Sequence, residues 1–100
     1  MKLYSTLTGK TETLSPVDDV VKMYVCGVTP YAPSHVGHAM NAVVFDVLRR
    51  YLESVGHRVK HVENFTDIDD KMIKTAADQG ISIGELAEIN IQAYLDEMDT

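Results

Sequence analysis

The chain has 100 residues, which is room for one small domain with one core, and its apolar share of 45% excludes disorder as a description of the whole. Its formal charge of −6 and its pI near 5.0 exclude a surface that binds nucleic acid through its electric field alone, because neutralising phosphates requires clustered Lys and Arg. No apolar run approaches the ~20 residues of a membrane span and no signal-peptide stretch opens the sequence, so we expect a soluble cytoplasmic protein.

The N-terminal half is predicted to hold two strands and a long helix. Residues 3–8 are typical of a short edge strand, and a turn at 14–16 separates them from an apolar run at 20–26 that predicts a buried strand. A loop rich in Gly and Pro follows. From His35 onward apolar residues recur every three or four positions, which predicts a helix with one buried face that ends near Gly56. The residues of that face are Met40, Val43, Val44, Val47, Leu48, Tyr51, Leu52 and Val55.

A second strand is predicted at 58–65, where Val59, His61, Glu63 and Phe65 alternate with Lys60, Val62 and Asn64 on the other side. A strand, a helix of roughly five turns and another strand make a βαβ unit, so we expect parallel strands and a right-handed crossover. The chain is therefore predicted to be of the α/β class. Ligands of such folds bind at the carboxyl ends of the strands.

A second helix is predicted directly after that strand. Thr66 is placed to cap it, and the helix should run to about Gly80. Three carboxylates within 67–70 crowd its positive end, where they are favoured by the helix dipole. The same carboxylates could be a magnesium site, but we prefer the structural interpretation because acidic residues are common at helix starts.

A third helix is predicted to begin at Ser82, because Ser82 and Glu85 have the spacing of a capping box. Its apolar face is formed by Ile83, Leu86, Ala87, Ile91, Tyr94, Leu95 and Met98. The helix still runs at Thr100, with no Gly, Pro or cap to end it. We therefore expect residues 1–100 to be a fragment of a longer chain.

The segment His35-Val36-Gly37-His38 carries the clearest chemical signal. Free backbone N–H groups at the start of a helix attract phosphate, and two imidazoles add donors aimed at the same anion. Gly37 would let a nucleotide approach the backbone closely, where any side chain would collide. The segment predicts a site for a nucleoside triphosphate, and the alternative is a pair of exposed histidines that simply begin a helix.

Three motifs, in order and in register with the βαβ pattern, carry a resemblance to a known family. They are Met23-Tyr24-Val25-Cys26-Gly27-Val28-Thr29, His35-Val36-Gly37-His38 and Asn64-Phe65-Thr66-Asp67-Ile68-Asp69-Asp70-Lys71. Nearly the whole chain resembles the N-terminal part of the cysteinyl-tRNA synthetases, which are class I aminoacyl-tRNA synthetases. The resemblance implies the first βαβ half of a Rossmann-like catalytic domain, with the helices that follow it.

The resemblance also implies an activity, which is ATP-dependent activation of cysteine to cysteinyl-adenylate and its transfer to tRNA(Cys). That tRNA would be bound through regions absent from these 100 residues. A related ligase of mycothiol synthesis, which joins cysteine to glucosaminyl-inositol, shares the motifs and is a second hypothesis. A free-standing nucleotide-binding module without ligase activity is the third.

Roles for individual residues follow from the resemblance. Cys26 matches one ligand of a zinc ion that recognises the cysteine thiolate. The alternative interpretation is that Cys26 has only a structural role, as a small buried residue at a strand end. His35 and His38 are implied to be catalytic, stabilising the triphosphate of ATP with Mg²⁺ while pyrophosphate leaves. Nucleotide binding is implied for His35, Gly37 and His38. The implied substrate-binding residues are Cys26, Gly27, Thr29, Asn41, Asn64 and Thr66.

Two positions depart from the family's pattern. Ala32 stands where an acidic residue is common, and Asn41 stands where threonine is common. The second signature loop with its catalytic lysine, the other zinc ligands and an anticodon-reading domain are missing. We therefore expect the chain alone to be inactive or very weak and to hold little or no zinc. A single βαβ unit should also leave a sheet edge exposed, which favours self-association.

Overall fold

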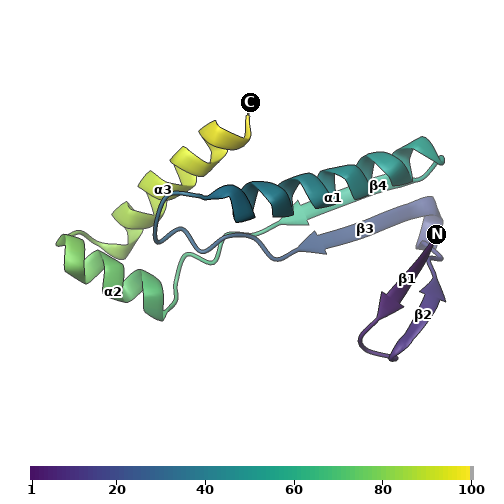
Figure 1. The fold of residues 1–100 in the computed structure, drawn as a ribbon, viewed down its shortest axis with the longest axis horizontal. Coiled ribbons are helices and arrows are strands. Elements are labelled where there is room, and N and C mark those ends of the chain that lie inside the picture. Colours follow the sequence, from purple (N-terminus) through teal and green to yellow (C-terminus); the bar gives the residue numbers. More distant parts are fainter. Residues whose placement is uncertain (100) are drawn as a thin grey trace.

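The structure is a computed structural model that describes residues 1–99. It contains two separate two-stranded sheets and three helices (Figure 1). In chain order the elements are β1 (Lys2–Ser5), β2 (Lys10–Thr13), the 3-10 turn η1 (Val17–Asp19), β3 (Val20–Val25), α1 (Val36–Ser54), β4 (Arg58–Glu63), α2 (Asp70–Gln79) and α3 (Ile83–Met98).

The predicted βαβ unit is confirmed in β3, α1 and β4. The two strands pair in parallel, in a register that runs from Val20 opposite Arg58 to Val25 opposite Glu63. Helix α1 lies along the sheet (Figure 1), and Val21 and Val25 of β3 are buried. Lys22 and Tyr24 are exposed on the other face, because side chains alternate along a strand. Both strands end slightly earlier than the sequence predicts.

The predicted buried face of α1 is wrong for most of its length. Leu52 is its buried residue, whereas an apolar stripe along the helix is exposed to solvent. The exposed fraction is 69% for Met40 and 60% for Val43. A sheet of two strands is too narrow to cover a helix of 19 residues on every apolar side. The exposed apolar stripe of α1 comprises Val36, Met40, Val43, Val44, Val47 and Tyr51, with Val55 as the residue that follows the helix.

The first strand does not join the βαβ sheet. Instead β1 pairs with β2 as an antiparallel hairpin, and Gly9, at a positive φ of 67°, donates its N–H to the Ser5 carbonyl across the turn. Strand β2 was not predicted, because its sequence Lys-Thr-Glu-Thr is polar and lacks an apolar alternation. The hairpin and the helices α2 and α3 lie at opposite ends of the molecule (Figure 1).

Helix α2 begins later than the sequence predicts. Asp69 caps it, its carboxylate accepting from the Met72 N–H at 2.8 Å, and Thr66 does not. The backbone N–H of Thr66 instead donates to the Val28 carbonyl at 3.0 Å, which holds the chain in an extended path before the helix can start. The predicted stop at Gly80 is confirmed by its left-handed conformation.

Helices α2 and α3 form a helical pair with its own core. Met72, Ala76, Leu86 and Ala87 make up this buried cluster. The capping box predicted at the start of α3 is confirmed by the reciprocal bonds of Ser82 and Glu85. Helix α3 ends at Met98, and the prediction that it continues through Thr100 falls partly outside the described residues.

The helical pair is tied to the βαβ unit by its own buried polar and aromatic groups. Asn90, in α3, donates to the carbonyl of the buried Pro30 at 3.0 Å. Tyr94 packs edge to face on Phe65, with ring centroids 5.6 Å apart. The loop after β3 and the segment after β4 are therefore both held from the side of α3.

The chain is extended rather than spherical. Its radius of gyration is 16.8 Å, and its extents are 49 × 32 × 24 Å. A compact chain of this length would have a radius of gyration of about 13 Å. The exposed apolar stripe of α1 is one result of that open shape.

Candidate functional site

The site is built where β3 and β4 end side by side. Beyond β3, the N–H of Gly27 donates to the side-chain oxygen of Asn64 at 2.7 Å. The Thr66 N–H bond to the Val28 carbonyl adds a second link between the two exit segments. A Cβ on Gly27 would lie 1.6 Å from the Asn64 carbonyl oxygen, so only glycine fits this close approach. The two segments are therefore locked together at the carboxyl ends of the parallel strands.

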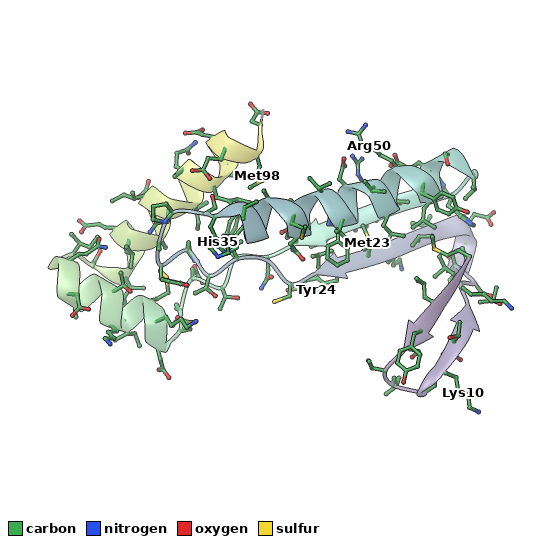
Figure 2. The ribbon with its side chains drawn as sticks, in the orientation of Figure 1. Lys10, Met23, Tyr24, His35, Arg50 and Met98 are labelled. Atoms are coloured by element: carbon green, nitrogen blue, oxygen red, sulfur yellow. The ribbon has the colours of Figure 1, made fainter. Side chains whose placement is uncertain are left out.

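The two histidines begin α1 and form its cap. His35 is the N-cap residue (Figure 2), and its Nδ1 accepts from the Gly37 N–H at 3.0 Å. The Nδ1 of His38 reaches back and accepts from the His35 N–H, also at 3.0 Å. The rings stack with centroids 4.0 Å apart. Because both Nδ1 atoms are acceptors, each neutral ring carries its proton on Nε2, where it is a donor.

Gly37 leaves room for the ring that caps the helix. A Cβ at this position would lie 2.8 Å from Cε1 of His35, so a side chain would push the His35 ring out of place. The close approach of a nucleotide that the sequence suggests stays a prediction. The structure adds a second reason for glycine here, which is the space that the histidine ring occupies.

A cavity of about 350 Å³ opens beside the locked segments. Its size lies at the lower end of the range for small-molecule sites, which is ~300–1,000 Å³. Residues from the loop after β3, from α1 and from α2 line it: Cys26, Gly27, Val28, Thr29, Tyr31, His38, Asn41 and Lys71. The cavity is therefore at the strand ends, as the βαβ pattern predicts.

The cavity unites part of the predicted site. Cys26, Gly27, Thr29, His38 and Asn41 all line it. The other predicted residues do not line it, and His35 lines a different cavity of about 710 Å³ between α1 and the end of α3. His35 and Gly37 hold the cap of α1, and Asn64 and Thr66 hold the exit segments together. Any substrate contact of these four residues stays a prediction, because their described bonds are to the protein itself.

The sequence did not predict three of the cavity residues, which are Val28, Tyr31 and Lys71. The ammonium group of Lys71 lies over the Tyr31 ring, 5.3 Å from its centroid. A signal for Lys71 existed in the sequence, because a cation in the first turn of a helix opposes the helix dipole. Nothing local in the sequence could show that the loop carrying Tyr31 folds back to the start of α2.

The described residues do not form a metal site by themselves. Cys26 is an exposed free thiol beside the cavity. Among residues 1–99 no group of three or more His, Cys, Asp or Glu side chains could hold a metal ion. A tetrahedral zinc site takes about four ligands, of which Cys26 can be one. Asp69 is committed to the cap of α2, so its structural interpretation is confirmed.

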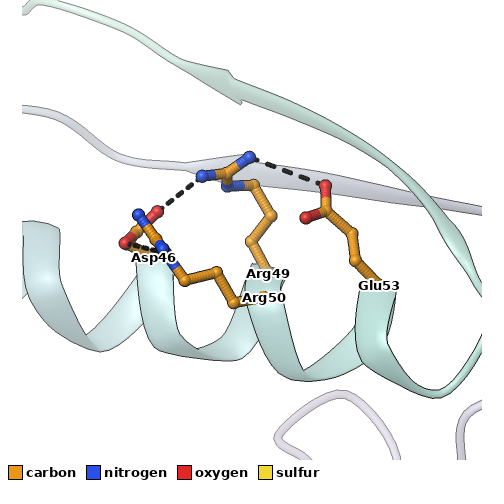
Figure 3. Close-up of polar contacts among 4 residues, drawn as sticks. All are labelled: Asp46, Arg49, Arg50 and Glu53. Atoms are coloured by element: carbon orange, nitrogen blue, oxygen red, sulfur yellow. Dashed lines mark hydrogen bonds and ion pairs between the residues drawn. The ribbon is translucent and has the colours of Figure 1, made fainter.

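The strongest charge network lies away from this cavity. Asp46 on α1 accepts hydrogen bonds from Arg49 and Arg50, and Arg49 also pairs with Glu53 (Figure 3). The hydrogen bonds to Arg49 and then Arg50 lower the pKa of Asp46, and Asp46 in turn raises the pKa of Arg49. All four groups are substantially exposed, so the network contributes little to stability.

Among the described helices, none has both the length and the hydropathy that a membrane-spanning helix needs.

The fold is that of a class I aminoacyl-tRNA synthetase. A solved structure of Mycobacterium tuberculosis methionyl-tRNA synthetase in complex with methionyl-adenylate is similar, with a TM-score of 0.71 and 24% identity. The match covers 78% of this chain and 16% of that chain. At this identity the likeness shows the fold, which is Rossmann-like α/β.

The chain belongs to the family of tRNA synthetases class I (C), whose catalytic-domain profile matches residues 13–100. It is 57% identical over 99 residues to a cysteine–tRNA ligase of Dehalococcoides mccartyi. The match covers 98% of this chain and 22% of the relative. The chain is 52% identical to a cysteine–tRNA ligase of Archaeoglobus fulgidus, covering 99% of this chain and 22% of the relative. The chain thus spans about a fifth of the length of these curated relatives.

Proposed function

We propose that this chain is the nucleotide- and cysteine-binding segment of a cysteine–tRNA ligase. The observation that carries the proposal is that Cys26 and His38 line the same cavity at the strand ends. Membership in the family supports it, and so do the relatives that bear this name. The reaction would be attack of the cysteine carboxylate on the α-phosphorus of ATP, with release of pyrophosphate, followed by transfer of cysteine to tRNA(Cys).

In this proposal the histidine pair stabilises the triphosphate. The Nδ1 atoms of His35 and His38 are occupied by backbone N–H groups, which leaves the Nε2–H groups to donate to phosphate oxygens. Donors that are already oriented stabilise the charge that develops as pyrophosphate leaves. ATP would enter with Mg²⁺, as nucleotides commonly do.

Cys26 is proposed as one ligand of a zinc ion, with the other ligands outside the described residues. Such an ion would bind the substrate as a thiolate, which serine cannot imitate. Thr29 and Asn41, on the cavity wall, are proposed as hydrogen-bonding contacts of the cysteine substrate or its adenylate.

The tRNA is proposed to bind mainly through other parts of the protein. The described segment has a formal charge of −6, and an acidic surface gives no field that would attract a polyanion. The proposed activity places the protein with the translation machinery in the cytoplasm.

The proposal is tested with the intact protein by cysteine-dependent exchange of pyrophosphate into ATP. We expect exchange with cysteine and none with serine, and we expect the tRNA(Cys) product rather than a cysteinyl amino sugar. His38→Ala should lower the exchange rate by about 10- to 1,000-fold, because it removes a charge-stabilising donor. His57→Ala is the matched control, since His57 lies beyond α1 and does not line the cavity.

Two results would contradict the proposal. One is an intact protein that does not activate cysteine at all, and the other is a His38→Ala variant that exchanges at the rate of the His57→Ala control.

A further inference from the structure

Lys71 brings a positive charge to the cavity from α2, whereas the histidine pair His35 and His38 lies at the start of α1. Lys71 lies in the first turn of α2, whereas His38 and Asn41 come from α1 and Cys26 and Thr29 come from the loop after β3. The three elements meet around the same space. Lys71 is thus the one fully charged cation among the described residues that line the cavity.

The position of Lys71 is not explained by the stability of its helix. A cation in the first turn of a helix opposes the positive end of the dipole. Lys71 forms no ion pair within residues 1–99, although Asp67, Asp69 and Asp70 are its neighbours in sequence. Asp69 is instead occupied as the cap of the helix. The charge of Lys71 is therefore left available on the cavity side.

The place of the ammonium group is fixed by the residues around it. It lies 5.3 Å from the centroid of the Tyr31 ring, a distance that favours a cation–π contact. Tyr31 packs against the core of the helical pair, and the preceding Pro30 is buried and bonded to Asn90. Met72, the next residue after Lys71, is fully buried in the same core. Both the aromatic platform and the backbone that carries Lys71 are thus anchored.

The other polar groups of the cavity do not supply a fixed charge. Thr29 and Asn41 offer neutral hydrogen-bonding groups, and His38 offers a neutral Nε2–H when its Nδ1 accepts. The reactants of an amino-acid activation are anionic at two places, the carboxylate of the amino acid and the phosphates of the nucleotide. An anion in a partly enclosed site is stabilised most by a charge-assisted bond.

We infer that Lys71 binds an anionic oxygen of the reactants in this cavity, from the amino-acid carboxylate or from a nucleotide phosphate. Tyr31 is a positioning residue that holds the ammonium group over the cavity. This inference rests on the proposed function, because it takes its ligands from that reaction.

The test uses three variants of the intact protein: Lys71→Met, Lys71→Arg and the control Lys74→Met, which removes an exposed lysine one turn further along α2. Methionine keeps the apolar stem against Tyr31 and is a good helix former, so the fold should be retained. Steady-state pyrophosphate exchange gives kcat and the KM values for cysteine and ATP separately.

We expect Lys71→Met to lower kcat/KM by about 10- to 100-fold, the scale of a lost hydrogen bond to a charged group. Lys71→Arg should recover most of this loss, and Lys74→Met should behave as the unchanged protein. A rise confined to the KM for cysteine identifies the carboxylate as the ligand. A rise in the KM for ATP, or a fall in kcat alone, identifies phosphate.

Lys71→Met kinetics equal to those of Lys74→Met would overturn the inference. An unchanged protein that shows no exchange would instead overturn the proposed function. Lys71 is then tested by equilibrium dialysis with ATP and with inorganic phosphate. Weaker binding by Lys71→Met than by Lys74→Met supports an anion-binding Lys71, and equal binding refutes it.

Discussion

The helices of the helical pair and helix α1 of the βαβ unit have similar apolar patterns, but their apolar side chains are buried to different extents. In the helical pair the exposed fraction is 0% for Met72 and 2% for Leu86, because the apolar faces of the two helices pack against each other. In the βαβ unit the stripe of α1 stays exposed, with Val43 at 60%, because two strands cover one side of it. An amphipathic pattern therefore predicts a helix face that needs a partner, but it does not show that the partner lies in the same segment.

The largest effect that would test this comparison is expected from truncating the core of the helical pair. Leu86→Ala should reduce the free energy of unfolding by about 2–5 kcal/mol, because it leaves a cavity in a packed cluster. Val43→Ala should change it by less than about 0.5 kcal/mol, since Val43 is exposed. Chemical denaturation of the chain followed by circular dichroism measures both. A loss at Val43 that matches the loss at Leu86 would mean that the stripe is covered.

The next effect is expected at the joint between the strand ends. Gly27→Ala should cost about 1–3 kcal/mol and disrupt the cavity, because its Cβ would collide with the Asn64 carbonyl oxygen. Gly84→Ala, in α3, should instead be neutral or stabilising by about 0.5–1 kcal/mol, since the nearest atom to its Cβ is 3.9 Å away. The pair is compared by thermal unfolding and by ATP binding. Equal effects of the two substitutions would refute the tight approach at Gly27.

The smallest effect is expected at the contact that links the two regions. Burial, and then the charge and hydrogen bond of Glu63 on β4, raise the pKa of Tyr94 on α3. A raised folded-state pKa means that this contribution to stability is present below the unfolded value of about 10 and is lost as pH rises through the folded value. Stability should therefore fall above about pH 10 in the unchanged chain.

Tyr94→Phe removes that pH dependence and costs about 0.5–1.5 kcal/mol at neutral pH, the scale of one hydrogen bond. The ring contact with Phe65 can be kept in this variant, which separates the polar link from the packing. Denaturation at pH 7 and at pH 11 provides the measurement. An identical fall in both proteins would show that Tyr94 does not carry the effect.

The sequence was sufficient for elements that have a strong period or a local cap. It predicts β3, α1 and β4 through their apolar spacing, and it predicts the start of α3 through Ser82 and Glu85. It wrongly predicts Thr66 as the cap of α2, where Asp69 caps the helix. Both types cap helices, and the choice was decided by the Thr66 bond to Val28 on a distant segment.

The site was predicted only in part, because local motifs can be identified in the sequence and long-range contacts cannot. Cys26 and His38 stand out because their motifs are compact and follow a strand or begin a helix. Tyr31 and Lys71 meet only through the packing of the loop on the helical pair, which has no local signature. The free sheet edges that the sequence predicts are present among the described residues, since β3 and β4 pair only with each other, and self-association through them stays a prediction.

The hydrogen bond between Gly27 and Asn64 can form only late in the synthesis of the protein, because the two residues lie 37 positions apart. The ribosome releases the chain from the N-terminus, so Cys26, the histidine pair and all of α1 emerge before Asn64 has been added. Until then the Gly27 amide lacks the acceptor that fixes it. Most side chains of the cavity are therefore synthesised early, while its shape is set only when the second parallel strand and α2 have left the exit tunnel.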